Sequence, residues 1–466
     1  MEKFDIVIIG GGPGGYTAGI KAAMKGAKTA VVEYDKLGGV CLNRGCIPSK
    51  ALIATAEQYQ KMKDAKSFGI NLESPPVYDW PAMLDRKNKI VSGLVGGIGQ
   101  LLKSHGVKHF NGWGKITGKN QVAVIDENNK EIKIEASNII IATGSRAVNL
   151  PPFPVDGIRI LNSDHLLELK NLPGSMFIIG AGVIGCEWAC MLSLLDVKVT
   201  IVEMMDRVLP MEDANNSKIL ARELKKQKVD IHTGTRVESI SPGARGILAK
   251  LSGGKSVEAD QALVAVGRAF NTEDLGLDEV KVKMNKNGSI PTGDDMRTNV
   301  KNIFAIGDVR GEILLAYTAV HDGVVAVENS LGGKGKKNYA GVPSVIFTHP
   351  EVASVGMTEE AASKKHTVVT GKFPLRALGK AHAENEIAGE ALVIADKKTD
   401  KLLGVHLCGV HATEVIHVAA MAVNQGMTAK QLGSLIFGHP VISEAIMEAA
   451  HDIHGECVHL AKKKSK

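Results

Sequence analysis

The sequence predicts an α/β protein in which two Rossmann-like, three-layer nucleotide-binding domains precede a C-terminal α+β domain. Two stretches predict the paired domains, because each has the order strand, glycine-rich loop, helix, strand and acidic residue. A third observation is that residues 341–466 lack this pattern and instead indicate a β-meander to about Leu407, followed by helices. A chain of 466 residues is too long for one hydrophobic core, so several domains are expected.

The composition is that of a globular protein, with 44% hydrophobic and 23% charged residues. No apolar run is long enough for a membrane span, and an apolar strand follows Met1 too closely for a signal peptide. We therefore expect a cytoplasmic protein, or an organellar one whose transit peptide has been removed. The net charge of +6 and the 4% aromatic residues argue against nucleic-acid binding, and the tail Lys462–Lys466 is expected to be a solvated end.

The first nucleotide-binding pattern begins with an apolar strand over Phe4–Ile9 and continues, after a glycine-rich loop, with a helix over Tyr16–Lys25. A second strand, Thr29–Val32, ends on Glu33. Glycines let the backbone approach a pyrophosphate, the helix N-terminus receives its charge, and the acid accepts hydrogen bonds from a ribose. The loop glycines are Gly10, Gly12 and Gly15.

The second pattern repeats the first, with a strand over Ser175–Ile179, a helix over Cys186–Leu195 and a strand over Lys198–Val202 that leads to Glu203. Two copies imply two bound dinucleotides. An acid at this strand end repels a 2′-phosphate, so the second cofactor should be NAD rather than NADP. The segment Val264–Arg268 repeats the pattern of a strand that ends in glycine and is expected to close this domain near the nicotinamide. The loop glycines are Gly180, Gly182 and Gly185.

Two cysteines, Cys41 and Cys46, follow the first pattern with four residues between them. A disulfide that closes so short a loop would add little stability to a large domain, which favours a redox role. Pro48 suits the first turn of a helix, and a helix N-terminus favours the thiolate of Cys46. For the pair in isolation, two buried thiols packed as small apolar side chains are an equal alternative. Cys186 and Cys190 are expected to be core residues.

Four further segments are expected to form regular elements or turns. Helices are expected over about Ala51–Phe68 and Trp80–His105, and a buried strand over Ile139–Ile141 ends in a tight turn. His439 precedes Glu444 by five residues, which taken alone favours an ordinary turn and helix N-cap. The alternative is a histidine that a carboxylate orients to deprotonate a thiol.

Along essentially the whole chain these motifs resemble the flavoprotein pyridine nucleotide-disulfide oxidoreductases, most specifically over Gly38–Lys50. The resemblance implies FAD in the first nucleotide-binding domain and NAD in the second. It also implies a homodimer whose C-terminal domains supply His439 and Glu444 to the partner's cysteines. The implied FAD residues are Gly10, Gly12, Gly15, Glu33, Lys50, Gly114, Thr143, Gly144, Asp308 and Ala316, and the implied NAD residues are Gly180, Gly182, Gly185, Glu203, Val237 and Gly267.

The activity that the resemblance implies is oxidation of carrier-bound dihydrolipoyl groups by NAD+. His439, oriented by Glu444, would deprotonate a substrate thiol, the thiolate would attack Cys41, and Cys46 would face the flavin. Lys50 is expected to pair with Glu187 near the flavin. The partners would be lipoyl domains of E2 or H-protein type carriers in 2-oxoacid dehydrogenase or glycine-cleavage complexes.

The domain division that follows is 1–149 for FAD, 150–269 for NAD, 270–340 for a central segment that returns to the FAD domain, and 341–466 for the dimer interface. Two alternative functions stay open: another NAD(P)H-dependent flavoprotein disulfide reductase, and a non-catalytic NADH-binding redox sensor. The chain departs from the usual family pattern at Arg44, Tyr317, Phe437, Gly438, Val441 and Ile442. These departures are expected to affect rate, flavin potential and docking rather than reaction type.

Overall fold

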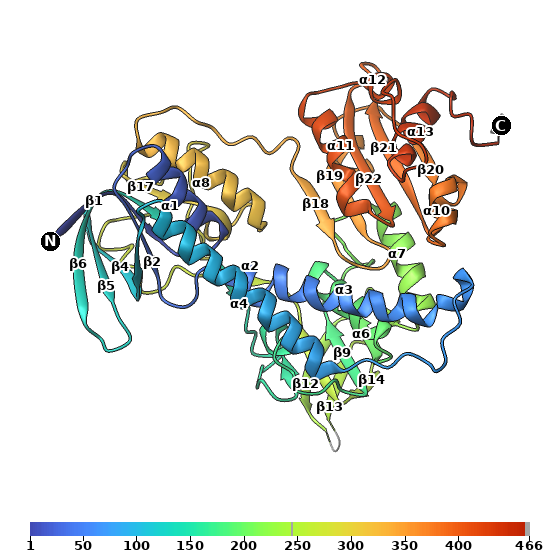
Figure 1. The fold of residues 1–466 in the computed structure, drawn as a ribbon, viewed down its shortest axis with the longest axis horizontal. Helices are drawn as coiled ribbons and strands as arrows, with labels where there is room; N and C mark the ends of the chain where they lie inside the picture. Colours follow the sequence, from blue (N-terminus) through green and yellow to red (C-terminus); the bar gives the residue numbers. More distant parts are fainter. Residues whose placement is uncertain (244–245, 462–466) are drawn as a thin grey trace.

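The computed structural model describes residues 1–243 and 246–461, so the predicted solvated tail 462–466 lies outside the described residues. Figure 1 shows three units, each built on its own sheet. We call them the first unit, which contains the N-terminal strand, the second unit, which contains the second glycine-rich loop, and the C-terminal unit. Among the described helices, none is both long and apolar enough to cross a membrane.

The first unit has a mixed sheet with parallel strands at its centre. In spatial order its strands are β3 (Lys108–Asn111), β2 (Thr29–Glu33), β1 (Glu2–Ile9), β6 (Glu131–Ile141), β5 (Gln121–Ile125) and β4 (Trp113–Gly118), with β17 (Ile303–Ala305) beside β6. The pairing of β17 with Ile139–Ile141 supports the proposed return of residues 270–340 to this sheet. Helices α1 (Pro13–Met24) and α8 (Ala316–Ser330) pack together in this unit.

The core strand β1 forms because Ile6–Ile9 is an unbroken apolar run, and burial of these residues on both faces is typical of a parallel sheet. Helix α1 begins at Pro13, earlier than the predicted Tyr16. Proline has the φ of a helix and lacks an N–H that would need a partner, so it opens the helix directly after the loop.

The cysteine motif is divided between two helices. Cys41 lies in α2 (Gly39–Arg44), and Cys46 is the first residue of α3 (Cys46–Lys63). The helix N-terminus predicted at Cys46, with Pro48 in the first turn, is confirmed, and the amphipathic stretch predicted from about Ala51 continues the same helix. The short turn η1 (Ala65–Phe68) follows α3. The long helix α4 (Trp80–Ser104) packs against α3.

The second unit is built on a parallel sheet whose strands, in spatial order, are β11 (Asp230–His232), β10 (Lys198–Val202), β9 (Ser175–Ile179), β15 (Gln261–Val264) and β8 (Ile160–Leu161). An antiparallel ribbon of β12 (Val237–Pro242), β13 (Ile247–Leu251) and β14 (Ser256–Ala259) adjoins it, and its helices are α5 (Ser163–Leu166), α6 (Val183–Leu194) and α7 (Ala214–Lys226). Cys186 and Cys190 are buried in α6, which confirms their predicted core role. Residues of α3, including Leu52 and Ala56, share a hydrophobic cluster with α6.

The strand predicted within Val264–Arg268 is present in the second unit as β15, but it lies earlier in the sequence than predicted. Strand β15 ends at Val264, and β16 (Arg268–Phe270) pairs instead with β7 (Ser145–Ala147) of the first unit. Gly267 has a φ of +136°, and this backbone conformation separates the two strands.

The C-terminal unit follows residues 331–342, which run without helix or strand from α8 to the start of this unit (Figure 1). Its antiparallel sheet has the order β18 (Pro343–Ile346), β19 (Val352–Gly356), β22 (Leu402–Gly409), β21 (Gly389–Asp396) and β20 (Val368–Pro374). The connecting and covering elements are α9 (Glu359–Ser363), η3 (Leu375–Ala377), α10 (Gly379–Ala383), α11 (Ala412–Asn424), α12 (Ala429–Gly433) and α13 (Glu444–Ile453). The predicted meander is found in part: β20, β21 and β22 pair in sequence, but β19 pairs with β22 rather than with β20. The predicted helices follow β22.

Candidate active site

A cavity of about 790 Å³ opens between the three units. It is large enough for an extended cofactor. The predicted residues that line it are Gly10, Gly12, Glu33, Cys41, Cys46, Lys50, Gly114, Thr143, Gly144, Glu187, Asp308 and Ala316. The predicted residues that do not line it are Gly15, Gly180, Gly182, Gly185, Glu203, Val237, Gly267, His439 and Glu444.

The two glycine-rich loops have the same geometry. A Cβ atom built at Gly15 would lie 1.9 Å from the carbonyl oxygen of Gly10, and one built at Gly185 would lie 1.9 Å from that of Gly180. Each loop therefore closes directly on its own helix, which leaves the first backbone N–H groups of that helix open to an anion.

Glu33, which ends β2, and Glu203, which directly follows β10, make equivalent hydrogen bonds. Glu33 accepts hydrogen bonds from the N–H groups of Gly11 at 2.7 Å and Asp35 at 2.9 Å. Glu203 accepts them from Ala181 at 2.8 Å and Met205 at 2.9 Å. Burial raises the pKa of Glu33, although these backbone bonds oppose the shift.

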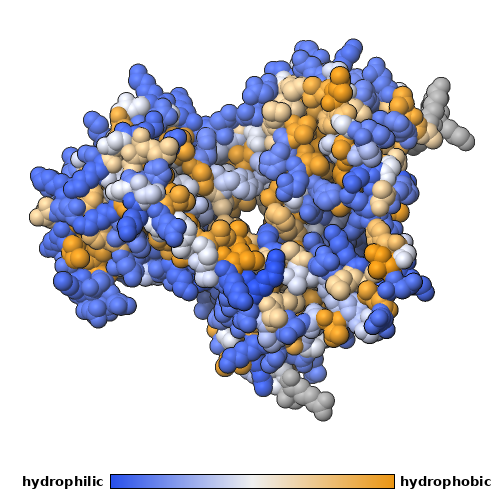
Figure 2. Space-filling model, in the orientation of Figure 1, coloured by the Kyte–Doolittle hydropathy of each residue, from blue (hydrophilic) through white to orange (hydrophobic). Residues whose placement is uncertain are grey.

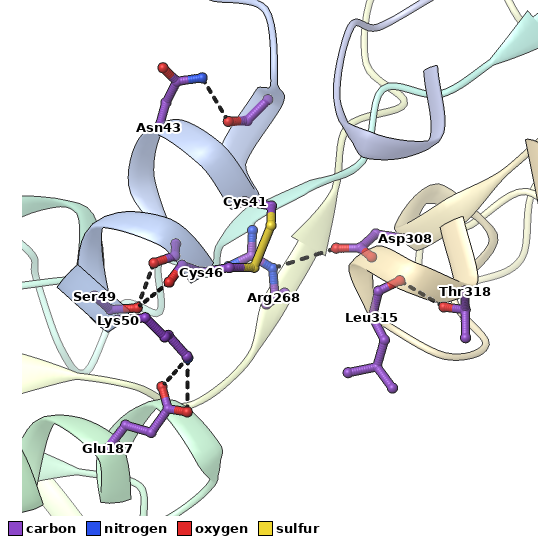
Figure 3. The surroundings of a disulfide bond; sticks show 12 residues. Cys41, Asn43, Cys46, Ser49, Lys50, Glu187, Arg268, Asp308, Leu315 and Thr318 are labelled. Carbon is purple, nitrogen blue, oxygen red and sulfur yellow. Dashed lines mark hydrogen bonds and ion pairs between the residues drawn. A yellow bond between two sulfur atoms is a disulfide. The ribbon is translucent and has the colours of Figure 1, made fainter. Parts of the chain in front are cut away.

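Cys41 and Cys46 form a disulfide at the wall of the cavity (Figure 3). Their Cα atoms are 4.7 Å apart. Asn43, between them, donates to the carbonyl oxygens of Leu37 at 3.1 Å and Gly39 at 3.0 Å, which ties the α2 segment to the loop before it. The predicted pairing of the two cysteines is confirmed.

Lys50 extends from α3 toward Glu187 of α6, and its Nζ lies 2.8 and 2.9 Å from the two carboxylate oxygens. The predicted contact between these residues is confirmed (Figure 3). Phe347 completes the group, because its N–H donates to Glu187 at 2.9 Å and its ring centroid lies 4.6 Å from Lys50 Nζ. All three units thus meet at one buried carboxylate.

Asp308 lies at the opposite wall, on the turn η2 (Gly307–Arg310) that follows β17. Ser145 donates its hydroxyl to Asp308 Oδ2, and Arg268 Nε donates to Ser145 Oγ at 2.6 Å. Arg268 Nε is also 3.9 Å from the Asp308 carboxylate (Figure 3). The guanidinium and hydroxyl groups hold this carboxylate at the cavity wall.

His439 and Glu444 lie together in the C-terminal unit, with His439 Nδ1 3.0 Å from Glu444 Oε1. Glu444 also accepts the Val441 N–H at 3.0 Å, and Ser443 supplies no side-chain cap to α13. Burial opposes ionisation of Glu444, but the Val441 N–H and His439 lower its pKa overall. The His439 side chain is 78% exposed. In a single chain, His439 is therefore exposed at the surface, and neither member of the pair lines the cavity.

The two remaining predicted NAD residues, Val237 and Gly267, lie outside the second glycine-rich loop. Val237 is buried in a hydrophobic cluster with Ile240 and Leu251, which leaves its backbone as the part able to meet a ligand. Gly267 lies between β15 and β16.

Sequence reasoning missed three residues with polar roles at the cavity: Ser145, Arg268 and Phe347. Ser145 and Arg268 each begin a short strand and Phe347 follows one, but their partners are more than 100 positions away. A local motif gives no signal for such contacts.

The donors present fit dinucleotide cofactors. The first cavity combines a helix N-terminus for a diphosphate, the Glu33 carboxylate for a ribose, and apolar side chains that include Ile9, Val32 and Leu315. The second loop repeats the helix N-terminus and the acid at Glu203.

Comparison with protein families agrees with this geometry. Residues 4–323 match the model of the pyridine nucleotide-disulphide oxidoreductases, and residues 342–450 match the dimerisation domain of the same family. The chain belongs to the pyridine nucleotide-disulphide oxidoreductase family. FAD and NAD(H) are the cofactors of this family, and the dimerisation domain indicates a homodimer.

The similar curated proteins within this family are dihydrolipoyl dehydrogenases. That of Chlamydia trachomatis is 41% identical over 452 residues, covering 96% of both chains, and one from Bacillus subtilis is 40% identical over 475 residues, covering 98% of this chain and 99% of the relative.

Two solved structures are also similar. LpdA from Mycobacterium tuberculosis matches with a TM-score of 0.90 and 28% identity over 97% of this chain and 99% of its own. The HOCl-induced flavoprotein disulfide reductase RclA from Escherichia coli matches with a TM-score of 0.85 and 29% identity over 96% of this chain and 99% of its own.

Proposed function

We propose that this chain is a dihydrolipoyl dehydrogenase, which oxidises protein-bound dihydrolipoyl groups to lipoyl groups and reduces NAD+ to NADH. The observation that carries the proposal is the Cys41–Cys46 disulfide in the wall of a cavity that also contains Glu33, Lys50 and Asp308. Full-length similarity to dihydrolipoyl dehydrogenases supports the substrate class.

In the proposed reaction His439 accepts a proton from one substrate thiol, with Glu444 orienting the imidazole. The substrate thiolate attacks Cys41, the Cys41–Cys46 bond breaks, and Cys46 leaves as a thiolate. The second substrate sulfur displaces Cys41 from the mixed disulfide, which releases the oxidised lipoyl ring and leaves both cysteines reduced. Bound FAD and NAD+ supply acceptors for the two electrons, and the cysteines return to the disulfide.

Other chain residues bind and orient the cofactors in this proposal. FAD would be held at the first loop by Gly10 and Gly12, with Gly15 allowing the loop to close on its helix, and Glu33, Asp308 and Ala316 would meet it along the cavity wall. NAD is held at Gly180, Gly182 and Gly185, with Glu203 at the ribose. The charge of Lys50 next to the flavin favours the reduced state, and Glu187 fixes its position.

The site requires two chains, because His439 does not line the cavity of its own chain. We propose that each subunit supplies His439 and Glu444 to the cysteines of the other. Lipoyl domains of E2 or H-protein carriers are the proposed partners. The cytoplasmic or organellar-matrix location stays a prediction.

A steady-state assay of NAD+ reduction by dihydrolipoamide tests the function, with FAD-loaded wild-type protein and a Cys41→Ser variant as the control. We expect turnover with NAD+, little turnover with NADP+ because of Glu203, and none in the variant. Absence of turnover in FAD-loaded wild-type protein would contradict the proposal and support the redox-sensor alternative.

A further inference from the structure

The turn that carries Asp308 is held at both ends by the same buried carboxylate. Gly307, the residue before Asp308, donates its N–H to Asp322 Oδ2 at 3.0 Å. Arg310, two residues after Asp308, donates from Nη1 to the same oxygen at 2.8 Å. The side chains of Arg310 and Asp322 are each 2% exposed. Asp322 lies on α8, so a helix and the turn beside it are joined through one atom.

Further bonds fix both members of this pair. Tyr339 donates its hydroxyl to the other Asp322 oxygen and accepts from Arg310 Nη1 at 2.7 Å. Arg310 Nε donates to Thr292 Oγ1 at 2.8 Å, and Arg310 Nη2 lies 3.0 Å from Glu312 Oε2. Tyr339 comes from the 331–342 segment that leads to the C-terminal unit. Each of the three guanidinium nitrogens of Arg310 therefore has at least one polar partner.

The turn has little freedom to move relative to α8. Gly307 has a φ of +69°, and a Cβ atom at this position would lie 2.9 Å from the Cβ of Ala319. A buried ion pair is weak evidence for stability, because apolar replacements of similar size are often neutral. Its directional bonds to both ends of a turn nevertheless specify one position for the residue between them.

We propose that Asp322 and Arg310 are positioning residues for FAD, which clamp the η2 turn against α8 so that Asp308 and Ala316 meet the cofactor together. This inference rests on the role of Asp308 given under Proposed function. Neither Asp322 nor Arg310 lines the cavity, so both act through the turn. Tyr339 closes the cluster from the segment that enters the C-terminal unit.

The test is the rate of FAD release from purified holoenzyme, followed by the fluorescence of free flavin. Asp322→Asn removes the charge that both ends of the turn share, and we expect release to be about tenfold faster or more, with a shifted flavin absorbance. The matched control is Glu223→Gln, which alters a 7% exposed carboxylate on α7 paired with Arg222 and Lys226, away from the cavity. This control should lower thermal stability without changing FAD release.

A second variant separates positioning from the cost of an unpaired buried charge. Arg310→Leu combined with Asp322→Leu removes both charges, so we expect thermal stability near that of the wild type while FAD release stays fast. Release at the wild-type rate in this double variant would overturn the proposal, as would equal release rates in Asp322→Asn and Glu223→Gln.

Asp308→Asn distinguishes failure of the clamp from failure of the site assignment. Fast release in Asp308→Asn with wild-type release in Asp322→Asn would mean that only the clamp is wrong. Wild-type release in Asp308→Asn would overturn both the assigned role of Asp308 and the clamp that depends on it.

Discussion

At the residue scale, the two cysteines of the disulfide are not equivalent. Cys46 is the first residue of α3, where the unpaired backbone N–H groups and the helix dipole favour a thiolate. Cys41 is the third residue of α2, which has only six residues against the 18 of α3, so the helix dipole at Cys41 is weaker. This difference supports the proposed flavin-facing role of Cys46 and the proposed exchange of Cys41 with substrate.

The spectrum of the two-electron-reduced protein tests this assignment. Cys46→Ser should abolish the long-wavelength absorbance that a thiolate gives next to flavin, because the thiolate is gone. Cys41→Ser is the matched control: it has no disulfide to reduce, so its Cys46 thiolate should give the band in the protein as purified, while the flavin is still oxidised. Persistence of the band in Cys46→Ser would reverse the two roles.

His439 is expected to act as the base of the thiol half-reaction alone. His439→Gln should lower lipoyl turnover by about 100-fold or more, the usual contribution of a general base. NADH oxidation by artificial acceptors should change little, because it needs no substrate thiol. His417→Gln, a surface histidine on α11, is the control. Equal losses in both assays would remove the proposed role of His439.

Glu444 predicts a pH dependence of stability. Burial disfavours its charge, but the Val441 N–H and His439 lower its folded-state pKa below the unfolded value. The ionised form therefore contributes stability above about pH 4.3, the ordinary glutamate pKa, and this is lost as pH falls through the folded pKa. Thermal melts should show Glu444→Gln less stable than wild type at pH 7, with the difference shrinking toward pH 3. A constant difference would contradict this account.

At the element scale, α3 and α6 bring the first and second units together through Lys50 and Glu187. The apolar faces of the two helices share one hydrophobic cluster, so the ion pair is fixed by packing rather than by flexible surface chains. This arrangement fixes the position of Lys50 in the wall of the cavity.

Lys50→Met should make the flavin midpoint potential more negative, because a positive charge that stabilises the reduced state is lost. A shift of about 30 mV corresponds to about 1.4 kcal/mol for two electrons. Lys63→Met is a matched control on the same helix, since Lys63 pairs with Asp196 at the surface. Equal potentials in wild type and Lys50→Met, measured with a reference dye, would contradict the role of Lys50.

At the whole-molecule scale, the isolated chain exposes apolar side chains on its C-terminal unit, and Figure 2 shows orange patches there. Ile436 is fully exposed, and Leu435 and Met421 are also exposed. Such residues are expected to be covered in the homodimer. The His439–Glu444 pair lies close to Ile436 in sequence, so dimer contact and completion of the site belong to the same surface.

Ile436→Glu should therefore favour monomers, because a charge in an apolar interface is costly. We expect lipoyl turnover to fall in parallel with the dimer fraction, while FAD stays bound and NADH oxidation by artificial acceptors persists. Sedimentation and the two assays measure these outcomes. Met24→Glu, at an exposed apolar residue at the end of α1, is the control. Full lipoyl turnover in a monomer would contradict the shared site.

Patterns within short stretches predicted much of this molecule. Both glycine-rich loops, their flanking strands and the cysteine motif depend on neighbours in sequence, so periodicity and glycine spacing were sufficient. Contacts between distant segments could not be found this way. Arg268 meets Ser145, and Arg310 meets Asp322 and Tyr339, only because the tertiary fold brings them together. The start of α3 at Cys46 could also be predicted from the sequence, because Pro48 is accepted in the first helical turn.

The pairing of β17 with β6 has a consequence for synthesis of the chain on the ribosome. The first sheet lacks one of its parallel strands until residues 303–305 leave the exit tunnel, after the whole second unit has been made. Nascent chains that stop before this point should remain open to proteases at the first sheet. The first unit therefore stays incomplete while the second unit, inserted within its sequence, is being made.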